Sequence, residues 1–266
     1  MIQKVFYFPQ IFPIFQEAHD FFVNTKKQTA TQHLFTNKQL RTLLVPIMVE
    51  QLLSSLMGTA DTMMVSNVGS AAISAVSLVD AINILVIQAL SALAAGGAIL
   101  CSQYLGSQNL KKAKCSAEQV LFVMLVLSCS LSLLCLIFRF PLLRLIFGTV
   151  DTDVMANSQI YFFFTLLSFP FIGLYDAGAS ILRAQNNTKG PMTISILSNF
   201  LNIGGNAILI FVFGMGVAGA AISTLISRIF CAIVVIWQLR NPAEQIYVRN
   251  YFSIRPDSVS YTHLRA

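Results

Sequence analysis

Long apolar blocks, separated by short polar segments, run through most of the chain. An apolar block of about 18 to 25 residues can cross a bilayer as a helix, because the hydrocarbon is about 30 Å thick and each helical residue rises about 1.5 Å. Blocks of this kind lie at about 42–65, 80–104, 118–138, 157–180, 191–213 and 217–239. Within them, segments such as LSCSLSLLCLIF (127–138) are apolar on nearly every face, unlike the alternating strands of a membrane barrel. The pattern predicts an all-α integral membrane protein with six transmembrane helices.

The composition agrees with this fold class. Hydrophobic residues make up 56% of the 266 residues and charged residues 11%, and the mean hydropathy is +0.71. A water-soluble domain carries about twice that charged fraction. The formal net charge of +6 comes from short basic clusters between the apolar blocks. We therefore expect the lipid bilayer, and not nucleic acid, as the partner of this chain.

The basic clusters also predict an orientation. They precede the first block and follow the second, fourth and sixth blocks: Lys26, Lys27, Lys38, Arg41, Lys111, Lys112, Lys114, Arg183, Lys189, Arg240, Arg249 and Arg255. Segments 66–79 and 214–216 contain no basic residue, and only Arg139 and Arg144 break the alternation. Cytoplasmic loops carry the excess of Lys and Arg. We expect a multi-pass protein of the inner (cytoplasmic) membrane with both termini in the cytoplasm.

Two carboxyl groups lie in the first block. Glu50 and Asp61 are eleven positions apart, which places them within about 20° of the same helix face. A carboxylate in hydrocarbon is unfavourable unless it faces protein or water, so the spacing predicts an acidic, cation-facing stripe about 16 Å long. The alternative is that both groups reach the headgroup regions at opposite ends of the helix.

The fifth block carries three amides on one face. Asn199, Asn202 and Asn206 fall within a sector of about 60°. Their carbonyl oxygens suit a hard cation or a polar substrate. Hydrogen bonds between neighbouring membrane helices explain the same pattern equally well.

The sixth block begins with small residues and contains a cation. Gly216, Gly219, Ala220 and Ser223 form a surface that favours close helix packing. Arg228 lies further along the same block and needs an acidic or carbonyl partner.

Other chemistry has little support in the sequence. Asp80 and Asp176 are placed near the ends of their blocks, where water can solvate them. None of His19, His33 and His263 lies in a block, and the five cysteines form no CxxC pair. We expect no enzyme activity, no organic cofactor, and no metal site beyond the cation-facing positions.

Together these residues resemble the multidrug and toxic compound extrusion (MATE) family of cation-coupled antiporters, in its prokaryotic branches. The matching motifs are P(46)-x14-D(61)-T-M-M-V, CSQYLG (101–106), LRAQNNTKGPM (182–192), N(202)-x3-N(206)-x3-I and GMGVAGAAISTLISR (214–228). They follow the family's order within residues 41–257. The resemblance implies a twelve-helix transporter with two six-helix lobes, of which this sequence matches the N-terminal lobe only.

The resemblance also implies roles for single residues. Pro46 matches the proline that bends the first helix, and Asp61 matches the carboxylate that binds the coupling Na⁺ or proton. Asn202 and Thr224 match the accompanying Na⁺ ligands, and Asn206 stands where the family often has Asp. We count Asn206 with the coupling residues.

Glu50 and Asn199 are assigned to the substrate cavity from their place on the same faces. The implied function is export of cationic amphipathic drugs or toxic metabolites in exchange for Na⁺ or protons. The alternatives are a related flippase of lipid-linked precursors and a non-transporting membrane scaffold. A flippase is expected to line its cavity with several Arg or Lys residues, and only Arg228 is available inside a block.

The ends of the chain lack the family's character. We expect residues 1–40 to be a cytoplasmic or interfacial extension, 41–240 the six-helix lobe, and 241–257 the start of an inter-lobe loop. Residues 258–266 read as an atypical tail produced by truncation, so the sequence is interpreted as a fragment that lacks the C-terminal lobe.

Overall fold

The computed structural model describes residues 37–148, 150–242 and 244–248. The chain divides into two compact units, Met1–Thr42 and Leu43–Ala266, and the packing of the long helices belongs to the second. The tail 258–266, most of the extension 1–40 and residues 249–257 of the expected inter-lobe loop lie outside the described residues.

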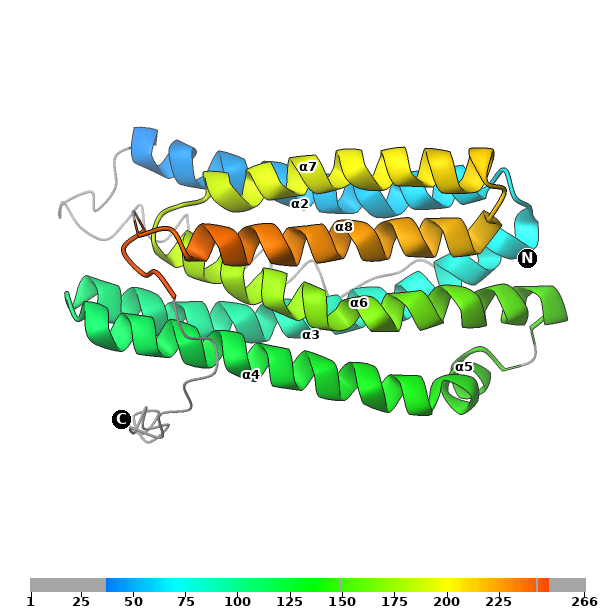
Figure 1. The fold of residues 1–266 in the computed structure, drawn as a ribbon, viewed down its shortest axis with the longest axis horizontal. Helices are drawn as coiled ribbons and strands as arrows, with labels where there is room; N and C mark the ends of the chain where they lie inside the picture. The colour runs from blue at the N-terminus through cyan, green and yellow to red at the C-terminus, as the bar shows by residue number, and fades with distance from the viewer. Residues whose placement is uncertain (1–36, 149, 243, 249–266) are drawn as a thin grey trace, which may run out of the picture. The chain divides into compact units, whose positions relative to one another are not determined.

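Helices make up nearly all of the described chain (Figure 1). In order they are α2 (Asn37–Val65), α3 (Ser70–Gly106), α4 (Leu110–Ile137), α5 (Arg139–Phe147), α6 (Thr152–Ala184), α7 (Lys189–Asn206), the π-helix η1 (Ala207–Val212) and α8 (Gly216–Leu239). No strand occurs in the part of the chain that the structure describes. The all-α fold class is confirmed.

The six predicted spans are confirmed, with α7 and η1 together forming the fifth. All six begin before the predicted bounds, and three do so by about five residues or more: α3 starts at Ser70, α4 at Leu110 and α6 at Thr152. Hydropathy marks the part of a helix that suits lipid, whereas backbone hydrogen bonds continue through the less apolar residues that precede it. The nine-residue helix α5, between the third and fourth spans, was not predicted.

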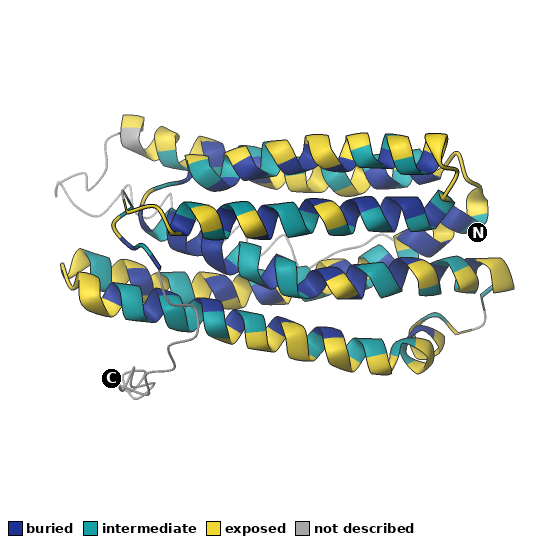
Figure 2. Cartoon of the chain, viewed as in Figure 1, coloured by how far each residue is buried: buried dark blue, intermediate teal, exposed yellow. Residues whose placement is uncertain are grey.

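Helix α6 is the centre of the packing. It packs against α3, α4, α5 and α8, and α8 packs in turn against α7 and η1. Glycines permit this closeness: a Cβ at Gly173 would lie 2.7 Å from the Ser128 hydroxyl, and one at Gly178 would lie 2.8 Å from Val235. Small residues at such contacts are typical of helix pairs in lipid. Figure 2 shows the resulting burial along α6 and α8.

Helix α2 is attached differently. Of the described helices, it alone belongs to no closely packed pair. Its buried residues within the second unit are confined to a narrow stripe, made of Pro46, Glu50, Asp61 and Val65. Its other faces present apolar side chains such as Met63, which is 68% exposed and suits contact with lipid. Few side chains therefore hold α2 to the other helices, and two of them are carboxylates.

Candidate functional site

The two carboxyl groups of α2 face the interior of the lobe. Asp61 is 3% exposed and Glu50 is 4% exposed, so the predicted shared face is confirmed. The alternative, in which both groups reach the headgroup regions, is wrong, because side chains of other helices cover both. Each carboxylate has its own partners.

Asp61 lies among polar side chains from α7 and α8. The Asn206 amide donates a hydrogen bond to Oδ1 of Asp61, and the Thr224 hydroxyl donates one to Oδ2 at 3.0 Å. The Asn202 amide donates to the Thr224 hydroxyl at 3.1 Å. All four side chains are buried. The structure therefore brings together the four residues expected to form the coupling site, and we call them the Asp61 group.

Local structure of α7 and α8 positions the Asp61 group. Asn202 and Asn206 are one helical turn apart, so their side chains lie on one face. Immediately after Asn206 the helix widens into η1, and such π-helical turns are frequent at functional sites. Gly205 faces Ser223 with no space for a Cβ, and the Ser223 hydroxyl donates to the Asn202 carbonyl at 2.8 Å. The small-residue surface of α8 thus packs closely, as predicted.

One atom of the Asp61 group is left over. Oδ1 of Asn206 is buried and has no hydrogen-bond partner among the described residues. With the Asp61 carboxylate and the oxygens of Asn202 and Thr224, it forms an oxygen-rich set of the type that hard cations prefer. The described residues contain no group of three or more His, Cys, Asp or Glu that suits a metal ion.

Asp80 was placed wrongly by the sequence. Because α3 begins at Ser70, Asp80 lies well inside the helix, half-buried, and not in solvent at a span end. Its Oδ1 accepts hydrogen bonds from the Asn83 amide at 3.2 Å and from the Tyr161 hydroxyl at 3.3 Å. The negative charge of Asp80 repels that of Asp61. Tyr161 carried no signal in the sequence, since a tyrosine in an apolar block reads as packing.

Glu50 forms a partly buried ion pair near the middle of α2. Arg183 Nη2 lies 2.6 Å from Oε1 of Glu50, and the Tyr175 hydroxyl donates to the same oxygen at 2.8 Å. Asn199, assigned with Glu50 to the substrate cavity, donates to the Ser195 carbonyl of its own helix at 2.9 Å. No side-chain hydrogen bond joins Asn199 to the Asp61 group among the described residues.

Two further sequence expectations are settled by contacts. Arg228 donates a hydrogen bond to the Ser168 hydroxyl at 2.6 Å, and it interacts electrostatically with the acidic groups of Asp61, Asp80 and Asp176. Asp176 is half-buried, and its Oδ2 has no hydrogen-bond partner among the described residues, which corrects its placement in solvent.

Pro46 is buried inside α2, which continues past it to Val65.

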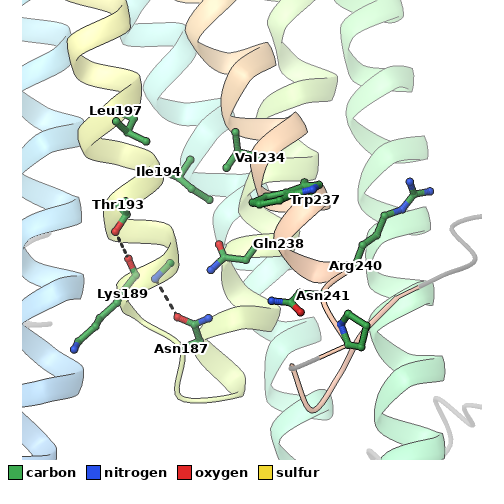
Figure 3. A pocket seen from close by; sticks show the side chains of 12 residues that line it. Asn187, Lys189, Thr193, Ile194, Leu197, Val234, Trp237, Gln238, Arg240 and Asn241 are labelled. Carbon is green, nitrogen blue, oxygen red and sulfur yellow. Dashed lines mark hydrogen bonds between the residues drawn. The ribbon is translucent and has the colours of Figure 1, made fainter.

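A cavity of about 830 Å³ lies apart from these groups. It is formed by the first turns of α7 and the last turns of α8, with Ile194, Trp237 and Gln238 around it and Lys189 and Arg240 at its sides (Figure 3). None of the predicted site residues lines it. The cavity is therefore separate from the Asp61 group.

The sequence matches a transporter family. The profile of the MatE family matches residues 46–208, which include Pro46, Asp61, Asn202 and Asn206 but not Thr224. The uncharacterized transporter YisQ of Bacillus subtilis is 34% identical over 196 residues, covering 72% of this chain and 42% of that protein. The probable multidrug resistance protein NorM of Thermotoga maritima is 28% identical over 198 residues, again covering 72% and 42%.

The fold is also that of known transporters. A crystal structure of MATE in the bent conformation superposes with a TM-score of 0.75 at 24% identity. The match covers 85% of this chain and 50% of that one. The chain thus spans about half of the solved structure and 42% of the curated relatives.

Proposed function

This chain belongs to the MatE family of membrane transporters, and we propose that it forms the N-terminal lobe of a cation-coupled antiporter that exports cationic amphipathic compounds. The membrane is the inner (cytoplasmic) one, and both ends of the chain lie in the cytoplasm, because the basic clusters gather at that side of the predicted spans. A second lobe supplies the opposite wall of the substrate pathway.

The Asp61 carboxylate carries this proposal. It is 3% exposed and receives its hydrogen bonds from the neutral groups of Asn206 and Thr224. Among the described residues, no lysine or arginine forms an ion pair with it. A carboxylate inside a membrane protein requires a neutralising partner, so the Asp61 carboxylate favours binding of a cation or a proton.

Competition for this charge would couple transport to the ion gradient. One carboxylate neutralises only one positive charge, so a drug cation and a coupling cation compete for it. Binding of one therefore favours release of the other. Because few side chains hold α2 to the lobe, binding of a proton or Na⁺ at Asp61 also changes one attachment of that helix. The charge state of one residue thereby biases the position of the helix.

The surrounding atoms support Na⁺ or a proton as the coupling ion. The buried, unpartnered Oδ1 of Asn206 adds a neutral oxygen ligand beside the carboxylate, as Na⁺ requires. A proton needs only the carboxylate. Dependence of export on external Na⁺ at constant pH distinguishes the two ions.

Dye export tests the proposal. We would express the chain, alone and joined to the remaining part of the Bacillus subtilis relative, in bacteria that lack their own efflux pumps. The joined chain is expected to lower ethidium and norfloxacin accumulation when an ion gradient is present. Asp61→Asn should abolish this export without preventing membrane insertion. Asp153→Asn makes the same chemical change at an exposed position and should leave export intact.

Other outcomes would support other functions. Undiminished export by Asp61→Asn contradicts the coupling role of this carboxylate. If dye accumulation is the same with and without the ion gradient, and the same in every variant, the result favours a membrane scaffold. A flippase of lipid-linked precursors would need cationic groups facing its cavity, but Arg183 is paired with Glu50 and Arg228 with the Ser168 hydroxyl.

A further inference from the structure

A second polar cluster lies on α2, about 16 Å along the helix from Asp61. It consists of Glu50 on α2 and Tyr175, Asp176 and Arg183 on α6, and we call it the Glu50 cluster. Arg183 and Tyr175 both contact Oε1 of Glu50. The Asp176 carboxylate interacts electrostatically with Arg183 and Glu50. The lining of the cavity at α7 and α8 includes none of these residues.

The Glu50 cluster holds an unusual concentration of unpartnered atoms. Oε2 of Glu50, Oδ2 of Asp176 and Nε of Arg183 are all buried and have no hydrogen-bond partner among the described residues. The Glu50 side chain is 6% exposed. Buried polar groups are nearly always satisfied, so several orphaned ones in one place indicate that a water or an ion binds there. Two of these three atoms are carboxylate oxygens, which accept and do not donate.

The balance of charge points to a cation as the missing partner. The groups that face the cluster are Glu50 from α2, Tyr175, Asp176 and Arg183 from α6, Ser195 from α7, and Cys231 and Arg228 from α8. Arg228 acts on Asp61, Asp80 and Asp176 alike. Among the described residues in the interior of the lobe, four carboxyl groups thus share two guanidinium groups: Glu50, Asp61, Asp80 and Asp176 against Arg183 and Arg228.

That balance leaves two negative charges without a basic partner. Uncompensated charge in a membrane interior is strongly unfavourable. One of the two charges belongs to the Asp61 group, where the proposed coupling ion neutralises it. The other remains between Glu50 and Asp176, next to the unpartnered oxygens.

We infer that the Glu50 cluster is a second cation site, which takes one monovalent positive charge, Na⁺ or a proton, between the carboxylates of Glu50 and Asp176. The site deepens the proposed function and rests on it, since it gives the lobe two cation positions on one face of α2. Arg183 orients the Glu50 carboxylate, and Asp176 supplies the second carboxylate.

Binding measurements on the purified chain in lipid nanodiscs test this inference. Binding of ²²Na⁺ reports Na⁺, and infrared spectra report protonated carboxyl groups. We expect Asp61→Asn to lose one of two bound positive charges per chain and retain the second. Asp61→Asn combined with Asp176→Asn should lose both. If the double variant does not fold, Glu50→Gln in the Asp61→Asn background replaces it in the same binding measurement and should also lose both charges.

The outcomes separate this inference from the proposed function. If the Asp61→Asn chain binds no Na⁺ and shows no protonated carboxyl group, the cluster holds only water and the inference is overturned. If Asp61→Asn changes nothing while Asp176→Asn removes a bound charge, the second site stands and the coupling role of Asp61 falls. Retention of the second charge in the double variant also overturns the inference.

Discussion

Replacing Asn206 by Asp tests whether charge beside Asp61 sets the affinity of the cation site that we propose at the Asp61 group. Asn206 is buried and donates its hydrogen bond directly to Asp61, so Asn206→Asp sets a second carboxylate against the first. Two unit charges about 4 Å apart repel by about 1 kcal/mol in water and about 4 kcal/mol at an effective dielectric of 20. A bound cation relieves this repulsion. Na⁺ should therefore bind between about 5-fold and about 1,000-fold more tightly, and the burial of both residues favours the upper part of that range.

Thermal unfolding in nanodiscs at increasing Na⁺ concentration measures the effect. At a Na⁺ concentration equal to the dissociation constant of the original chain, ligand binding stabilises the fold by only about 0.4 kcal/mol, whereas a 100-fold tighter site gives about 2.7 kcal/mol. Protons compete for the same charge, so the Na⁺ effect should shrink as the pH falls. Asn199→Asp is the matched control. It adds the same charge on the same helix, but the Asn199 amide donates to a backbone carbonyl and not to Asp61.

Equal gains of Na⁺-dependent stabilisation in Asn206→Asp and Asn199→Asp would refute the reasoning. The added negative charge on the helix, and not its contact with Asp61, would then set the Na⁺ affinity. The absence of any shift in Asn206→Asp would remove Asp61 from the cation site.

Three further substitutions test the packing and the polar contacts by thermal unfolding of the purified chain. Thr224→Val removes the hydroxyl that donates to the Asp61 carboxylate and should lower the free energy of unfolding by about 1 to 3 kcal/mol. Thr224→Ser keeps a hydroxyl and should lose much less. Equal losses in the two variants would show that the hydroxyl is irrelevant. Arg183→Gln leaves the Glu50 charge buried and unpaired, so we expect a loss of about 3 to 5 kcal/mol that Glu50→Gln partly relieves; an unrelieved loss would contradict the ion pair. Gly219→Ala sets a Cβ 3.1 Å from the backbone of η1 and should destabilise by about 1 to 3 kcal/mol, whereas Gly204→Ala has open space and should be neutral or stabilising by up to about 1 kcal/mol. Equal effects of the two glycine substitutions would contradict the close contact of α8.

The amino-acid sequence was sufficient for the features that depend on near neighbours along the chain. Apolar blocks of sufficient length predicted the six spans. Helical geometry alone placed Glu50 and Asp61 on one face, and Asn202 and Asn206 on another. The grouping of Asp61 with Asn202 and Thr224 came from resemblance to a family, because no spacing connects residues on three different helices.

Only the tertiary structure decided which helices meet. Asp61 contacts Asn206 and Thr224 across 145 and 163 residues, and Glu50 contacts Arg183 across 133. The sequence placed Arg183 beyond the fourth span, but it lies in the last turn of α6. The sequence also treated Asp176 as a solvated acid, but it is half-buried. Hydrophobicity in lipid favours every apolar face equally, so it does not choose a partner for a helix. Steric fit at small residues and the need to satisfy buried polar groups make that choice, and both depend on atoms that are distant in the chain.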